Sequence, residues 1–286
     1  MPGPMRRLGV SNLAWPARAE ARALALLAAR GAQGVEVAPT RIAPWDELTP
    51  QRLSAFRQGC TEAGLVVSSM QAIFYGRPEA TLLGEPADFE AMAEQVRRIA
   101  GIAHALGAGV AVFGAPNSRL RGTLSPADAM QRGAERLRRL GDLAAAGGLV
   151  LCMEPVPAIY GADFLNHADE VVEIVRAAGH PSVRAHLDTA CVCLAGDDVA
   201  AAIRAAAPLL AHYHMAEPQL GPFAHPVLDH ARAGATLDEV DYQGWVVIEM
   251  REVEAEADED GLGAVAAAIA YARRHYAGVP VSSPAR

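Results

Sequence analysis

Residues 125–154 read SPADAMQRGAERLRRLGDLAAAGGLVLCME and contain the unit from which the whole chain is built. Ser125 and Pro126 supply an N-cap and a first-turn proline, and the amphipathic stretch that follows runs until Gly147 ends it. The short apolar run Leu149–Met153 comes directly afterwards. A helix that leads within a few residues into an apolar strand is typical of the βα units of a parallel sheet.

The same alternation can be followed from one end of the chain to the other. The predicted strands are Arg7–Val10, Gly34–Ala38, Leu65–Met70, Gly109–Phe113, Leu149–Met153, Val183–Leu187, Leu210–Tyr213 and Trp245–Ile248. The predicted helices are Ala17–Arg30, Pro50–Ala63, Pro86–Leu106, Ser125–Ala146, His167–Ala178, Asp197–Ala206 and Asp258–Ala277. The seventh unit, Glu217–Val240, is the least regular, because a long proline-containing loop, Pro218–Val227, precedes its short helix.

Eight such units in 286 residues, without a linker-like change of composition, favour one α/β domain that spans residues 1–286. A doubly wound sheet would need fewer strands and a glycine-rich first turn, and the chain has neither a GxGxxG nor a Walker motif. The sequence therefore predicts a closed (β/α)8 barrel.

Composition excludes several classes of protein. A net charge of −8, with 25 Lys and Arg residues spread along the helices, argues against a nucleic-acid partner. No stretch reaches about 18 uninterrupted apolar residues, so we expect no membrane span. The four cysteines form no CxxC motif and the first ten residues resemble no secretion signal, so a reducing cytoplasm is the expected compartment. A monomer and a homo-oligomer are both compatible with the sequence.

Four consecutive predicted strands end in residues that bind metals: Glu154, Asp188, His214 and Glu249. In a barrel of this kind, the carboxyl ends of all strands open into one mouth, so these side chains become neighbours. Three carboxylates packed together repel one another unless a cation lies between them. This mostly oxygen set predicts one divalent metal ion, with Mn²⁺, Mg²⁺ or Co²⁺ favoured and Zn²⁺ tolerated.

A second layer of side chains follows from strand alternation, since residues two positions back point the same way. His186 lies two residues before Asp188, and His212 lies two residues before His214. These histidines are predicted to orient the metal ligands by hydrogen bonding, and the alternative for either is a packed core histidine.

The pattern as a whole resembles the xylose isomerase-like barrel superfamily. That group includes sugar phosphate isomerases and epimerases, ketose 3-epimerases, hydroxypyruvate isomerases, inosose dehydratases and, more distantly, apurinic endonucleases. The resemblance implies a divalent metal held by the four strand-end residues, and the closing segment YQGWVVIEM, residues 242–250, is similar to the last strand of the family. Two positions depart from the ketose 3-epimerases: Tyr160 stands where they carry a second glutamate, and Cys191 stands where they carry a histidine.

The resemblance implies an isomerase or epimerase of a small sugar or polyol, phosphorylated or not. A hydroxyketone held through its oxygens would lose a proton to one glutamate, Glu154 or Glu249, and the enediolate would regain a proton from the other. Further candidates for substrate contact are Glu36, Gln71, Tyr160, His186, Glu217 and His230.

Three other functions stay open at this point. A lyase or dehydratase acting on a sugar, an inosose or a C-glycoside could use the same enediolate. An apurinic endonuclease would need more histidines and carboxylates and a basic face, which the acidic charge does not favour. A non-catalytic binding barrel is the third alternative.

Overall fold

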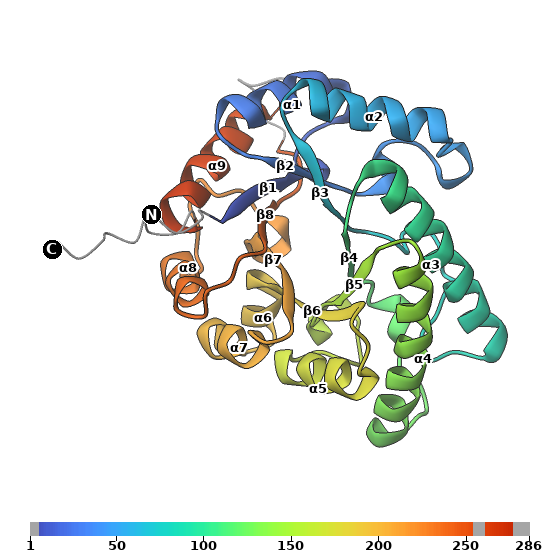
Figure 1. Cartoon of the computed structure of the whole chain (residues 1–286). Helices are drawn as coiled ribbons and strands as arrows, with labels where there is room; N and C mark the ends of the chain where they lie inside the picture. The colour runs from blue at the N-terminus through green and yellow to red at the C-terminus, as the bar shows by residue number, and fades with distance from the viewer. Residues whose placement is uncertain (1–5, 254–260, 277–286) are drawn as a thin grey trace, which may run out of the picture.

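The computed structural model describes residues 6–253 and 261–276, and eight parallel strands in it close a barrel in chain order (Figure 1). The strands are β1 Arg7–Ser11, β2 Gly34–Val37, β3 Val66–Met70, β4 Val110–Phe113, β5 Val150–Met153, β6 Val183–Asp188, β7 Leu210–Ala216 and β8 Trp245–Glu249. Each strand pairs with the next one along the chain, and β8 returns to pair with β1. The predicted (β/α)8 barrel is therefore confirmed.

Helices surround this barrel and follow the strands in turn, as the ring of coiled ribbons in Figure 1 shows. Their bounds are α1 Glu20–Ala29, α2 Pro50–Glu62, α3 Pro86–Leu106, α4 Pro126–Ala146, α5 Ala168–Ala178, α6 Thr189–Leu194, α7 Val199–Ala206, α8 His230–Glu239 and α9 Leu262–Tyr276. The predicted helix Asp258–Ala277 corresponds to α9, and residues 258–260 and 277 lie outside the described residues.

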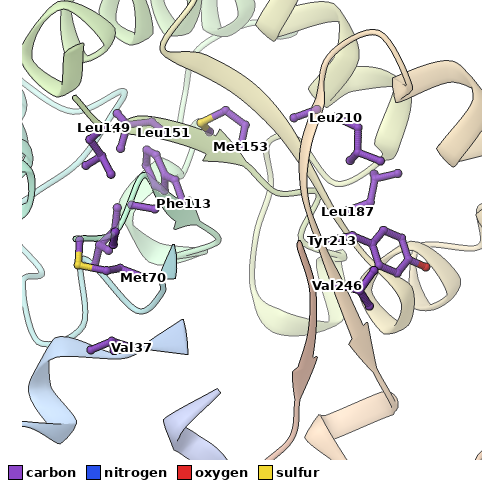
Figure 2. Close-up of a cluster of buried hydrophobic side chains, with 14 of the residues drawn as sticks. Val37, Met70, Phe113, Leu149, Leu151, Met153, Leu187, Leu210, Tyr213 and Val246 are labelled. Carbon is purple, nitrogen blue, oxygen red and sulfur yellow. The ribbon is translucent and has the colours of Figure 1, made fainter. Parts of the chain in front are cut away.

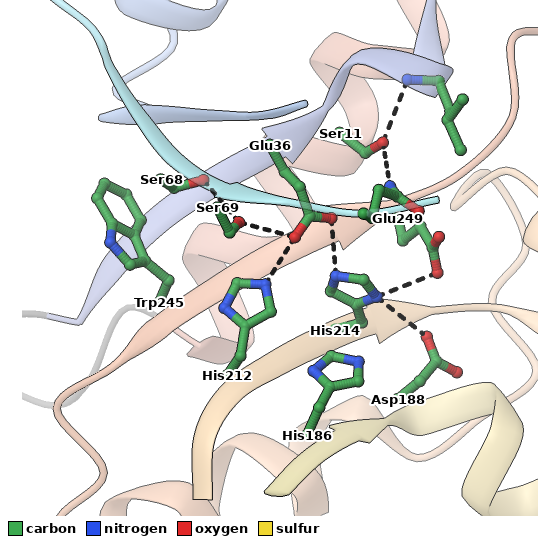
Figure 3. A network of polar contacts seen from close by, with 12 residues as sticks. Ser11, Glu36, Ser68, Ser69, His186, Asp188, His212, His214, Trp245 and Glu249 are labelled. Atoms are coloured by element: carbon green, nitrogen blue, oxygen red, sulfur yellow. Dashed lines mark hydrogen bonds and ion pairs between the residues drawn. The ribbon is translucent and has the colours of Figure 1, made fainter. Parts of the chain in front are cut away.

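Alternating side chains along each strand separate two environments. Leu187 of β6, Tyr213 of β7 and Val246 of β8 are buried among the apolar side chains drawn in Figure 2. Their strand neighbours His186 and His214 belong instead to the polar network of Figure 3. One strand thus packs the apolar core with one set of residues and supplies the polar interior with the other.

Most predicted bounds shift by up to a few residues, and two of the differences involve site residues. Strand β7 continues through Ala216, because His214 and Ala216 pair in register with Val247 and Glu249 of β8. The short helix α6 was not predicted; Asp188, the last residue of β6, caps its start, and the carboxylate accepts a hydrogen bond from the backbone N–H of Cys191 at 2.7 Å. In the described part of the chain, no helix has the length and apolarity needed to cross a membrane.

Candidate functional site

The four predicted metal ligands come together at the carboxyl ends of β5 to β8 (Figure 3 shows three of them). Glu154, Asp188 and His214 each offer one ligand atom, and these atoms lie within 4.8 Å of one another. Glu249 joins them, since its Oε2 is 3.1 Å from Nδ1 of His214. The same nitrogen lies 3.8 Å from Oδ2 of Asp188. The exposed fractions of Glu154, Asp188 and His214 are 8%, 2% and 1%, so these groups have lost nearly all their contact with water.

Burial and mutual repulsion change the proton affinities of these carboxyls. Desolvation, followed by the charges of Asp188 and Glu249, raises the pKa of Glu154 to about 8. Desolvation and Glu249 raise the pKa of Asp188 to about 7. Burial disfavours the imidazolium of His214, but the carboxylates of Glu36 and Glu249 outweigh it and raise the pKa of this histidine well above its usual value. In the metal-free protein these carboxyls tend to hold protons, which a bound cation would displace.

The donor set fits a divalent cation. Oδ2 of Asp188 is buried and has no hydrogen-bond partner among the described residues, while Oδ1 is used at the start of α6. Carboxylate oxygens together with one imidazole nitrogen are ligands that Mn²⁺, Mg²⁺ and Co²⁺ accept, whereas a structural zinc site would use thiolates. The unpartnered oxygen and the crowded carboxylates are the features that a bound cation would satisfy.

A layer of polar residues lies beneath this cluster in the barrel interior (Figure 3). Glu36 of β2 has no exposed surface, and its carboxylate accepts hydrogen bonds from Ser69 Oγ at 2.7 Å and His212 Nε2 at 2.7 Å. Its second oxygen lies 2.8 Å from Nε2 of His214. Glu36 was expected to contact substrate; its side chain lies buried among these partners and outside the lining of the mouth cavity.

His186 and His212 are both fully buried in this layer. The ring of His186 packs edge-on against that of His214, with centroids 4.2 Å apart, and its Nε2 lies 3.7 Å from Oε1 of Glu154. His212 contacts Glu36 rather than a predicted metal ligand. The structure thus places both histidines in support of the cluster, and neither lines the cavity where a substrate contact by His186 was expected.

A cavity of about 500 Å³ opens directly above the cluster, a size typical of sites for small molecules. It is lined by residues 71–78 after β3, residues 112 and 114–118 in and after β4, and Glu154, His214 and Glu249. Gln71 lies in this lining, as expected, and its amide donates to Ser11 Oγ at 2.5 Å. Ionic groups form one side of the cavity, and Ile73 and Phe74 contribute apolar surface on the side of the β3 loop.

Two further neighbours, of which the sequence did not point to the first, constrain the position of Glu154. A Cβ atom added to Gly114 would lie 1.8 Å from Oε2 of Glu154, so only glycine leaves room for the carboxylate. Arg119, fully buried, donates from Nη1 to the backbone oxygen of Glu154 at 2.6 Å, and burial lowers the pKa of this guanidinium to about 10. A glycine directly after a strand was the available signal for the first of them.

The remaining predicted contacts lie in the loops around the mouth and outside the cavity lining. Glu217 is buried and accepts from the backbone N–H groups of Val227 and Leu228. His230 lies 2.8 Å from Glu217 and, through its other ring nitrogen, 2.6 Å from the hydroxyl of Tyr276. In this structure these contacts hold the long seventh loop in place, and the expected contact of Glu217 and His230 with a substrate stays a prediction.

Tyr160 has 38% of its surface exposed, and its hydroxyl accepts a hydrogen bond from the backbone N–H of Gln219 at 3.3 Å. This contact joins the loop after β5 to the loop after β7. The structure therefore brings Tyr160 to the rim of the mouth and not into the cavity lining.

The chain resembles known proteins both in sequence and in fold. D-Psicose 3-epimerase of Agrobacterium fabrum is 31% identical over 118 residues, which cover 41% of this chain and 40% of that protein. D-Psicose 3-epimerase of Ruminiclostridium cellulolyticum is 29% identical over 119 residues, covering 42% and 40%. The chain thus spans about 40% of the length of each of these curated relatives in the matched region.

Among solved structures, D-psicose 3-epimerase from Clostridium cellulolyticum H10, determined with D-tagatose, superimposes with a TM-score of 0.78. The match covers 94% of this chain and 99% of that chain at 18% identity, a level that shows a shared fold. The family model described as xylose isomerase-like TIM barrel matches residues 24–274, most of the 286 residues. The chain therefore belongs to the xylose isomerase-like TIM barrel family.

Proposed function

We propose that this protein is a divalent-metal-dependent epimerase or isomerase of a small sugar or polyol derivative. The observation that carries the proposal is the cluster of Glu154, Asp188, His214 and Glu249, three of which, Glu154, His214 and Glu249, line a cavity of about 500 Å³. Membership of the family and the partial match to two D-psicose 3-epimerases support the same activity.

In this proposal Glu154, Asp188, His214 and Glu249 hold the cation, with Mn²⁺, Mg²⁺ or Co²⁺ as the expected ion. When bound, a divalent cation polarises a substrate carbonyl and balances negative charge that develops on its oxygen. The protein's own groups move the protons. Glu154 and Glu249 come from different strands, so one carboxylate can remove the proton next to the carbonyl while the other delivers a proton to the opposite face or to the neighbouring carbon.

Burial beside other carboxylates raises the pKa of Glu154 in the metal-free protein, and a bound cation would lower it again by favouring the ionised carboxylate that can accept a proton. Burial of these side chains strengthens the electrostatic contacts among them. Epimerisation and isomerisation then differ only in where the returning proton goes.

The test is a screen of the metal-loaded protein against ketoses and polyol derivatives, with and without phosphate, in deuterated buffer. Incorporation of deuterium next to the carbonyl, followed by NMR, supports the proposal, and analysis of the products separates an epimer from an isomer. The absence of exchange with every sugar of the panel, by a protein that binds the metal, would overturn it.

A lyase on a C-glycoside or an inosose derivative is the second candidate. The apolar surface contributed by Ile73, Phe74 and Val112 favours it, because a substituted sugar could place an apolar group against this wall. The screen separates this outcome too, since a lyase releases two products or an unsaturated one.

A further inference from the structure

We propose that Glu36 is a positioning residue that fixes the tautomer and orientation of His214, and that the affinity of the site for a divalent cation depends on it. The inference rests on the metal site of the proposed function and not on the identity of the substrate. Glu36 lies on β2 and His214 on β7, so the contact between them crosses the interior of the barrel (Figure 3).

Burying the carboxylate of Glu36 costs free energy unless its oxygens have polar partners. Its side chain has no exposed surface, and an unpaired carboxylate in such a place would cost several kcal/mol. The neighbouring inward positions of the same sheet include Ser69 and His212, each of which donates to this one carboxylate. Three strands therefore contribute polar residues to this layer. Apolar residues could fill the same space without needing hydrogen-bond partners.

The geometry determines which nitrogen of His214 carries a proton. Nε2 of His214 lies 2.8 Å from Oε1 of Glu36, an ion-pair contact, and an unprotonated nitrogen so close to a carboxylate oxygen would be repelled by it. A proton therefore resides on Nε2. The other ring nitrogen, Nδ1, faces Glu249 Oε2 at 3.1 Å and Asp188 Oδ2 at 3.8 Å. While no cation is bound, Nδ1 also carries a proton, which it shares with Glu249. A cation among the carboxylates would displace this proton and bind His214 through Nδ1, because the proton on Nε2 is held by Glu36.

The same contacts decide against a different use of these histidines. Nitrogens of His186, His212 and His214 also lie within 4.8 Å of one another, which by distance alone would allow an ion among the three rings. However, Nε2 of His212 and Nε2 of His214 already contact Glu36 at 2.7 and 2.8 Å. The first contact is a hydrogen bond and the second is an ion pair, so the carboxylate of Glu36 already compensates the charge of these two nitrogens. The three histidines form the support of the site above them.

The experiment compares the binding of Mn²⁺ to the metal-stripped wild-type chain, Glu36→Gln and Ser69→Ala by calorimetry. The glutamine keeps the volume of Glu36 and removes its charge, and we expect the Kd for Mn²⁺ to rise about 10- to 100-fold. Ser69→Ala is the matched control, because it removes a hydrogen bond to the same carboxylate without touching His214. We expect its Kd to stay within about threefold of wild type, well short of the change expected for the loss of an outer-shell carboxylate.

A folded Glu36→Gln protein that binds Mn²⁺ as tightly as wild type would overturn the inference and leave the proposed function intact. A wild-type chain that binds no Mn²⁺ would overturn both. A second measurement needs no variant: ¹⁵N NMR of the histidine rings in the Mg²⁺-loaded wild-type protein should show the proton of His214 on Nε2. A proton on Nδ1 in that state would contradict the role of Glu36 even if the glutamine variant failed to fold.

Discussion

Glu154 follows β5 and Glu249 ends β8, so the two carboxylates reach the cavity from different strands. Replacing either by glutamine keeps its size and removes its capacity to accept a proton. We expect Glu154→Gln and Glu249→Gln each to lower kcat at least about a hundredfold, the usual scale for loss of a general base. Steady-state kinetics on the substrate found in the screen measures this, with the exposed Glu94→Gln as the control. Either variant retaining near-normal turnover would remove that residue from the proton transfer.

The crowded carboxyls also predict a coupling between metal and protons. With the pKa of Glu154 at about 8 and that of Asp188 at about 7, both carboxyls carry protons for much of the time at pH 7 in the metal-free protein. A cation binds their ionised forms, so binding should release protons into solution. Calorimetry of Mn²⁺ binding at pH 7 in two buffers of different ionisation enthalpy counts those protons.

The sign of the pH dependence follows from the raised pKa values. Since the carboxyls lose their protons as the pH rises past about 8, the number of protons released should fall between pH 7 and pH 9, and the affinity for Mn²⁺ should rise. Equal heats in both buffers at pH 7 would show that the carboxyls are already ionised without metal.

Among individual residues, the sequence pointed to those that end the strands, but it did not reveal the roles of the polar residues that lie beneath them in the barrel. Glu154, Asp188, His214 and Glu249 could be found because each follows directly from an apolar run. The role of Glu36 could not be found in this way, because its partners His212 and Ser69 lie on other strands and only the three-dimensional register brings them together.

Among the elements, the start of the β4 loop sets the room available to Glu154. The Cβ of an alanine at position 114 would fall 1.8 Å from Oε2 of Glu154, so the carboxylate would have to leave its place. We expect Gly114→Ala to lower kcat at least about tenfold and to weaken Mn²⁺ binding, since displacement of a catalytic group by about 1 Å can cost up to a hundredfold.

The matched control is Gly109→Ala. Gly109 directly precedes β4, whereas Gly114 directly follows it, and a Cβ added at Gly109 meets nothing within 4 Å. Kinetics and metal titration of the two variants side by side test the prediction. If both glycine variants behave alike, the close approach at Gly114 does not control the position of Glu154.

The elements themselves were predicted to within a few residues, because apolar runs and capping residues mark their ends. The strand β7 was the main exception: it was expected to end at Tyr213, and pairing with β8 carries it on to Ala216. Polar residues such as His214 look like the end of a strand in the sequence, although the polar interior of this barrel accepts them. The helix α6 escaped prediction because its six residues are too few to show a helical period.

For the molecule as a whole, the cation should act as a stabilising ligand. Only the folded barrel brings Glu154, Asp188 and His214 within 4.8 Å, so the unfolded chain has no comparable site. At a free concentration of about 100 times its Kd, Mn²⁺ should therefore raise the free energy of unfolding by about 2.7 kcal/mol. Urea unfolding with Mn²⁺ and with a chelator measures the difference, and Asp188→Asn should abolish most of it. A stability that does not respond to the metal would argue against a site formed by folding.

The closed order of the strands also has a consequence for how the protein is made. Glu36 and His212 are separated by 176 positions in the chain, yet they share one hydrogen bond, and the site above them needs Glu249 as well. A chain emerging from the ribosome cannot assemble this site while β8 is still unmade, because the barrel then has an open edge between β1 and β7. If the proposed metal site is correct, the ion is bound only after β8 has closed the barrel, and metal binding then reports that the nascent chain has completed its fold.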